Sequence, residues 1–127
     1  MVQRVLINLQ NYVLGEAVEQ ALKNAGDFQI EVVENPKEVV KKQFGFAATV
    51  VLMEVTGYTP YKLSERMLIR DEIRKQDPQC KIVLMVDENA DRQLATQVKQ
   101  LKKDGLIDQF IYGSTSAAFL AALMETV

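Results

Sequence analysis

Glu54, Asp87 and Glu88 are the side chains of this sequence that are best placed to do chemistry. Glu54 lies near the end of the apolar run Thr49 to Val55, and Asp87 and Glu88 follow the run Lys81 to Val86. Short apolar runs rich in β-branched residues predict strands buried on both faces of a parallel sheet. Ligands bind beyond the carboxyl ends of such strands, so we expect the three carboxylates at one edge of the sheet. Carboxylate oxygens suit Mg²⁺, which makes the three residues a candidate metal site, with solvated loop acids as the alternative.

The sequence contains no histidine and a single cysteine, Cys80. The absence of histidine excludes Ser-His-Asp and Cys-His catalysis, His-ligated metals and phosphohistidine relays. One cysteine cannot form an intramolecular disulfide, and it does not favour a structural zinc site. Because Cys80 precedes an apolar run, we expect a buried thiol and not a reactive nucleophile.

The composition is that of an ordinary globular protein, and we expect a single domain over residues 1–127. Apolar residues make up 48% of the chain, charged residues 25%, and the formal net charge is −2. A nucleic-acid-binding surface needs clustered positive charge, so direct contact with nucleic acid is not expected. No apolar run reaches the roughly 18 residues of a membrane span, and no signal peptide is recognisable, which predicts a cytoplasmic location.

Strand and helix patterns alternate along the whole chain. We expect strands at 4–8, 28–32, 49–55, 81–86 and 107–112, and helices within 11–25, 35–45, 61–76, 90–103 and 114–127. This alternation predicts a three-layer, doubly wound (βα)5 α/β fold with a five-stranded parallel sheet. The second strand alternates apolar and polar residues and therefore belongs at an edge, which favours the flavodoxin-like order 2-1-3-4-5.

The helix patterns also predict which side chains face the core. We expect Phe44 to point inward from the second helix, which Gly45 would end, and Phe119 to point inward from the last helix. Arg66 belongs to a dense group of charged residues in the third helix, and such a group usually forms a solvated outer face.

In topology, spacing and strand-final acid, the chain resembles the receiver domain of two-component response regulators, the CheY-like fold, over essentially its whole length. The resemblance places Glu54 at the aspartate that accepts a phosphoryl group. It places Leu9 and Gln10 at the two acids that hold Mg²⁺, Val86 at a switch Ser or Thr, and Tyr112 or Gly113 at a conserved lysine.

All of these marker positions depart from the family pattern, which indicates a degenerate receiver. Phosphoryl transfer to a carboxylate needs an in-line nucleophile and a divalent ion. Leu9 supplies no metal ligand, Gln10 supplies only a neutral carbonyl, and Glu54 is one methylene longer than the usual acceptor. The expected pocket also lacks a positive side chain, which a permanent substitute for the phosphorylated acceptor would require.

We therefore expect a signalling module that acts by protein–protein contact, without enzymatic activity, cofactor or phosphorylation. By resemblance, its partner protein, output domain or second copy would bind the face formed by residues 91–103, 108–112 and 116–124. Two alternatives remain: an atypical phosphoacceptor that uses Glu54 with Mg²⁺, and a flavodoxin-like small-molecule-binding protein. The second alternative lacks the phosphate-binding loop that a flavin or nucleotide would need.

Overall fold

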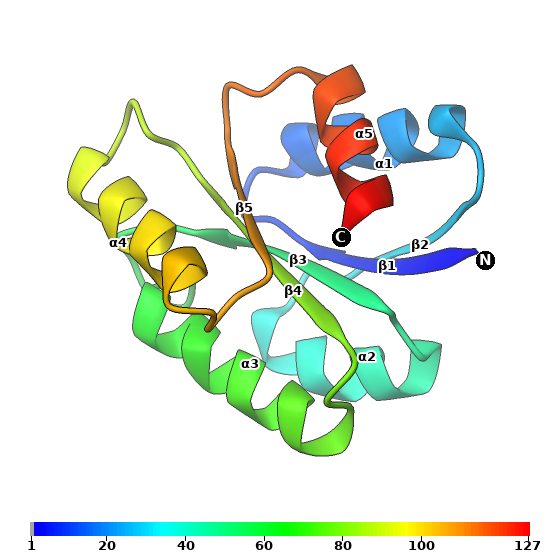
Figure 1. Cartoon of the computed structure of the whole chain (residues 1–127), viewed down its shortest axis with the longest axis horizontal. Coiled ribbons are helices and arrows are strands. Elements are labelled where there is room, and N and C mark those ends of the chain that lie inside the picture. Colours follow the sequence, from blue (N-terminus) through cyan, green and yellow to red (C-terminus); the bar gives the residue numbers. More distant parts are fainter. Residues whose placement is uncertain (1) are drawn as a thin grey trace.

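The structure, a computed structural model, describes residues 2–127 and confirms the predicted fold class. Five parallel strands form one sheet in the order β2-β1-β3-β4-β5. Helices α1 and α5 cover one face of the sheet, and α2, α3 and α4 cover the other (Figure 1). The elements are β1 (Gln3–Asn8), α1 (Tyr12–Ala25), β2 (Phe28–Val32), the 3-10 turn η1 (Pro36–Glu38), α2 (Val39–Phe46), β3 (Val50–Val55), α3 (Leu63–Gln76), β4 (Lys81–Val86), α4 (Arg92–Lys103), β5 (Gln109–Tyr112) and α5 (Ala117–Thr126).

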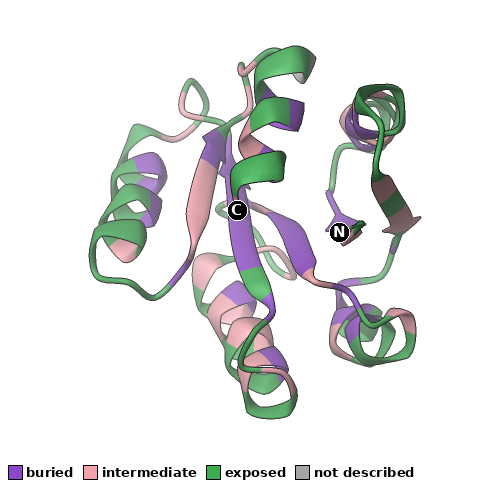
Figure 2. Ribbon diagram, turned by 45° about the vertical axis from the view of Figure 1, so that its right-hand side comes forward, coloured by how far each residue is buried: buried purple, intermediate pink, exposed green. Residues whose placement is uncertain are grey.

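The burial of each strand follows its place in the sheet. The central strands β1, β3 and β4 are almost wholly buried, whereas the edge strand β2 has no fully buried residue (Figure 2). Successive side chains of a strand point to opposite faces. Leu6 of β1 accordingly packs under α2, α3 and α4, and Ile7 packs under α1 and α5. The amphipathic second strand lies at an edge, as its alternation predicted.

Helix starts are fixed by the side chains that the sequence offers as caps. Asn11 accepts a hydrogen bond from the backbone N–H of Leu14, and Ser116 accepts one from Phe119. Such caps satisfy backbone donors that the first turn of a helix leaves unpaired. The cap at Asn11 fixes the start of α1 beside the carboxyl edge of the sheet, where the Asn11 N–H also meets Glu54.

Three expectations about helix faces and ends are wrong. Phe44 and Phe119 are exposed, with 73% and 61% of their surfaces accessible. In α2 the inward row passes through Val39 and the buried Gln43, so position 44 faces solvent. In α5 the row is centred on Leu120, and position 119 lies at its margin. Helix α2 also continues past Gly45 and ends where Ala47 adopts the left-handed conformation (φ 55°).

Within residues 2–127 no helix combines the length and the apolar character that crossing a membrane requires.

Candidate functional site

Glu54 lies where β3 reaches the carboxyl edge of the sheet, half-buried and turned toward the start of α1. Its Oε1 accepts a hydrogen bond of 3.1 Å from the backbone N–H of Asn11. The amino end of a helix carries partial positive charge, so a carboxylate is stabilised there. Glu54 therefore has a defined structural partner at the amino end of α1.

Arg66 supplies a buried positive charge at this edge, and the expectation of a solvated Arg66 is wrong. The residue has no accessible surface. Its Nε donates to the carbonyl oxygen of Glu54 at 2.8 Å, and its Nη2 donates to the carbonyl oxygen of Asn8 at 3.3 Å. The guanidinium also lies over the ring of Tyr61, 4.8 Å from its centroid. The ends of β1 and β3 are thus joined to α3 through one cation.

Burial lowers the pKa of Arg66 to about 10, while the nearby Tyr61 and Glu54 act in the opposite direction. The group remains a cation at neutral pH. Its donors are directed to backbone carbonyl oxygens, and none of the basic residues that the structure describes lines the cavities that open at this edge. The burial of Arg66 could have been predicted from its position in the helix. It follows Leu63 by three residues and precedes Ile73 by seven, which places it on the inward row of α3.

The other family-equivalent positions are spread between core and surface. Leu9 is buried in the core under α1 and α5, while Gln10 is exposed. Val86 is fully buried and is paired in register with Tyr112, whose ring is partly exposed. Gly113 donates its N–H to the carbonyl oxygen of Val86 at 2.9 Å. Of these three positions only Tyr112 carries a hydroxyl, a phenol, and none carries a cation.

Two neighbouring cavities open at the edge, and Glu54 and Asp87 line both. One has a volume of about 560 Å³ and also includes Gln10; the other, of about 280 Å³, also includes Asn11. Asp87 Oδ1 accepts hydrogen bonds from two amides of its own loop. Glu88 lines neither cavity and accepts a hydrogen bond from the Ser114 hydroxyl.

The acids of this edge offer two carboxylates, and not three, to a shared space. Across residues 2–127, no group of three or more His, Cys, Asp or Glu side chains is arranged to hold a metal. Glu54 and Asp87 share cavities, but Glu88 does not join them. Mg²⁺ is usually held by one or two carboxylates together with waters, in near-octahedral geometry.

The thiol of Cys80 is buried, as predicted. Burial raises its pKa to about 12, with a smaller contribution from Asp77. A thiol is nucleophilic only when ionised. Cys80 is therefore an inert core residue at neutral pH.

Neither a protein-family model nor a curated protein sequence matches the chain. Solved structures do match. An orphan response regulator of H. pylori is 18% identical, with a TM-score of 0.73 over 98% of this chain and 94% of that one. The response regulator TrrA of Thermotoga maritima, solved with Mg²⁺-BeF, is 19% identical, with a TM-score of 0.72 over 98% of both chains. A CheY-like receiver domain protein of Methanospirillum hungatei is 13% identical, with a TM-score of 0.78 over 99% and 93%. Likeness at such identities establishes the fold, and the fold of this chain is that of response regulator receiver domains.

Proposed function

We propose that the chain is a receiver-like signalling module of the cytoplasm that acts through protein–protein contacts and does not depend on phosphorylation. The observation that carries this proposal is the arrangement around Glu54. Its carboxylate accepts a hydrogen bond from the Asn11 N–H, and its backbone carbonyl oxygen accepts one from the guanidinium of the buried Arg66. These contacts give the carboxylate and the carbonyl oxygen of Glu54 hydrogen-bond partners within the chain.

The residues around Glu54 are poorly suited to phosphoryl transfer. The reaction needs a nucleophile in line with its donor and a divalent ion that neutralises the transferring group. Leu9 is part of the hydrophobic core and Gln10 is neutral. The carboxylate of Glu54 is also engaged by a helix terminus. Each of these features supports a role that does not require a phosphoryl group.

The fixed positive charge of Arg66 also supports a role that does not depend on phosphorylation. A receiver that senses phosphorylation must change its charge balance when the modification occurs. Here the guanidinium of Arg66 is fixed to the backbone carbonyl oxygens of two strand ends, Asn8 of β1 and Glu54 of β3. We therefore propose that the carboxyl edge holds one conformation, and that signalling consists of binding a partner protein, an output domain or a second copy.

Phosphorylation of Glu54 in the presence of Mg²⁺ remains a second candidate. One observation favours it: Glu54 and Asp87 line the same two cavities, so two carboxylates face a shared space. The lack of a third ligand among the described acids weighs against it.

Treatment with acetyl phosphate and Mg²⁺ separates the two candidates. The protein is incubated with both reagents and measured by intact mass, and a thermal shift is measured in parallel with beryllofluoride and Mg²⁺. The proposal predicts an unchanged mass and an unchanged melting temperature. A mass increase of one phosphoryl group that is lost in Glu54→Gln would establish the phosphoacceptor instead. Stabilisation by flavin mononucleotide in the same melting assay would favour a small-molecule-binding function.

A further inference from the structure

The outer side of β2 is an open edge of the sheet, since within residues 2–127 this strand pairs only with β1. Val33 donates its N–H to the carbonyl oxygen of Ile7 at 2.8 Å, so alternate residues of this segment, 29, 31 and 33, turn their backbone groups toward β1. The residues between them turn theirs the other way. Ile30 and Val32 therefore direct N–H and carbonyl groups outward, where another strand can pair with them.

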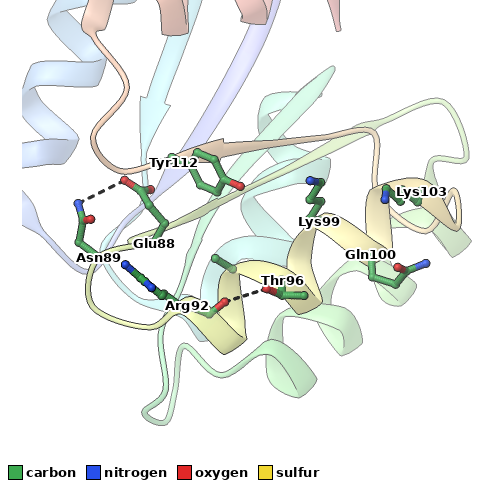
Figure 3. Close-up of a pocket in the computed structure, with 9 residues that line it drawn as sticks. Glu88, Asn89, Arg92, Thr96, Lys99, Gln100, Lys103 and Tyr112 are labelled. Atoms are coloured by element: carbon green, nitrogen blue, oxygen red, sulfur yellow. Dashed lines mark hydrogen bonds between the residues drawn. The ribbon is translucent and has the colours of Figure 1, made fainter.

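The open edge at β2 lacks the features that usually prevent further strand pairing. Such features are lysine, proline, a bulge or a very short strand. The sequence Phe28–Val32 has neither lysine nor proline and pairs with β1 over five consecutive residues. At the other edge, β5 has four residues and lies beside lysines of α4. Lys102 is 5.9 Å from the ring centroid of Phe110, and Figure 3 shows Lys99 across a hollow from Tyr112. Of the two edges of the described sheet, β2 is thus the one open to a further strand.

Apolar side chains are exposed on both sides of this edge. Val32 is 40% exposed and shares its face of the strand with Phe28 and Ile30, which pack under α1 and α5. On the other face, the exposed Phe44 lines a hollow of about 610 Å³ together with Glu31. Apolar side chains grouped beside an unpaired edge favour contact with another protein.

The sequence of β2 is complementary to a second copy of itself in antiparallel orientation. With Ile30 opposite Ile30, Phe28 lies opposite Val32 and Gln29 lies opposite Glu31. Opposite residues of antiparallel strands point to the same face, so the apolar pairs share one face and the polar pairs share the other. The outward backbone groups fall at the hydrogen-bonded positions of this register. The two Ile30 residues exchange two hydrogen bonds, and each Val32 N–H meets the carbonyl oxygen of Phe28.

Charge is also complementary in this register. Arg4 lies beside Gln29 in the sheet, and its Nη1 donates a hydrogen bond to Oε1 of Gln29. The amide nitrogen of Gln29 can donate to the carboxylate of Glu31 from the second copy. Glu31 takes part in no ion pair within residues 2–127. A two-fold axis makes this contact occur twice, so each copy gives one carboxylate and receives one.

We infer that β2 binds β2 of a second copy in antiparallel register centred on Ile30, which joins the five strands of each copy into one continuous sheet. This inference rests on the proposed function and names a second copy as the partner. The contact lies at the free edge of the sheet, and residues of α4 and α5 take no part in it.

Hydrogen exchange of single amides tests the register. The whole chain is measured by NMR at protein concentrations of about 20 μM and about 500 μM, a range that suits a weak dimer. Protection of the Ile30 and Val32 amides should rise about tenfold with concentration, because they gain acceptors in the dimer. The amide of Glu31 faces β1 and should be equally protected at both concentrations. Protection of Ile30 and Val32 that does not change with concentration would overturn the inference.

Charge reversal at the edge tests the contact between Glu31 and Gln29. Glu31→Lys places two cations next to Arg4 of the opposite copy, and should raise the Kd for self-association about tenfold in sedimentation equilibrium. The matched control, Glu72→Lys, makes the same change on the exposed face of α3 and should stay within about twofold. Equal Kd values for the two variants, or a wild type that is monomeric up to about 1 mM, would contradict β2 pairing.

A second pair of variants tests the backbone contact. Val32→Pro removes an outward N–H and leaves the hydrogen bonds to β1 in place, because proline is tolerated where an edge N–H faces solvent. It should weaken self-association at least about tenfold, whereas Val32→Ile keeps the donor and should stay within about twofold. Circular dichroism establishes that both variants are folded. Equal Kd values for the two folded variants would exclude pairing through this strand.

These results are distinguishable from a failure of the proposed function. A protein that accepts a phosphoryl group from acetyl phosphate and still pairs through β2 overturns phosphorylation independence but retains the dimer. A protein that stays unphosphorylated and monomeric overturns the dimer alone.

Discussion

Arg66 on α3 donates a hydrogen bond of 2.8 Å from Nε to the backbone carbonyl oxygen of Glu54 on β3. A second hydrogen bond, from Nη2 to the carbonyl oxygen of Asn8, joins the same side chain to β1. Strand-end carbonyl oxygens in a buried position need a donor, and desolvation makes an unpaired one costly. The cation of Arg66 therefore stabilises the carboxyl edge of the sheet.

Replacement of Arg66 by methionine should destabilise the protein. Methionine has a similar length and no donor, so the carbonyl oxygens of Asn8 and Glu54 would lose their partner. Relief of the buried charge offsets part of this loss. We expect the free energy of unfolding to fall by about 2 kcal/mol, and the melting temperature to fall by roughly 5–10 °C.

The control for this substitution is Arg92→Met on α4, which makes the same chemical change at an exposed position. It should alter the free energy of unfolding by less than about 0.5 kcal/mol. Thermal melting by circular dichroism compares the two variants. Equal melting temperatures would mean that Arg66 does not stabilise the edge.

Glu54→Ala should weaken the start of α1. The variant removes the acceptor of the Asn11 N–H and the negative charge at the amino end of the helix. We expect a loss of about 1 kcal/mol in urea unfolding, comparable with the removal of a helix cap. Glu54→Gln keeps an acceptor oxygen, so its loss should be smaller. Equal losses in the two variants would show that the charge outweighs the hydrogen bond.

The sheet was predictable from sequence because each strand carries its own burial pattern. The run from Val50 to Val55 is apolar throughout and is central, whereas Phe28 to Val32 alternates and lies at an edge. The end of the fourth strand at Val86 also followed from the apolar run that begins at Lys81. These features are local, because a strand's composition records how many of its faces are covered.

The charge of the site was not predictable from residue type alone. Arg66 was assigned to a solvated face because it stands among acids and bases, although its spacing from Leu63 places it on the inward row. Its burial depends on carbonyl oxygens of β1 and β3, which are distant in the sequence. The prediction that Phe119 is buried was wrong because an apolar residue at the margin of the inward row of a helix can remain exposed to solvent.

The buried thiol of Cys80 predicts a loss of stability at high pH. Burial raises its pKa from the usual 9.0 to about 12 in the folded state. Above pH 9 the unfolded chain releases this proton while the folded protein keeps it, so the unfolded state gains stability as the pH rises. Between pH 8 and pH 10, the wild type should lose about 1 kcal/mol relative to Cys80→Ala in urea unfolding. If the free energies of unfolding of the two proteins changed equally with pH, the thiol would have the same pKa in the folded and the unfolded state.

Substitutions at two neighbouring positions of α5 should lower the free energy of unfolding by very different amounts. Leu120 is 2% exposed and packs under the sheet, whereas Phe119 is 61% exposed. Leu120→Ala should cost about 2–5 kcal/mol, because it removes buried methyl groups and leaves a cavity. Phe119→Ser should cost less than about 0.5 kcal/mol, because little buried surface is lost. Chemical unfolding measures both variants. A cost of more than about 2 kcal/mol for Phe119→Ser would instead mean that a second copy covers this ring in solution, a possibility that the concentration dependence of melting would then establish.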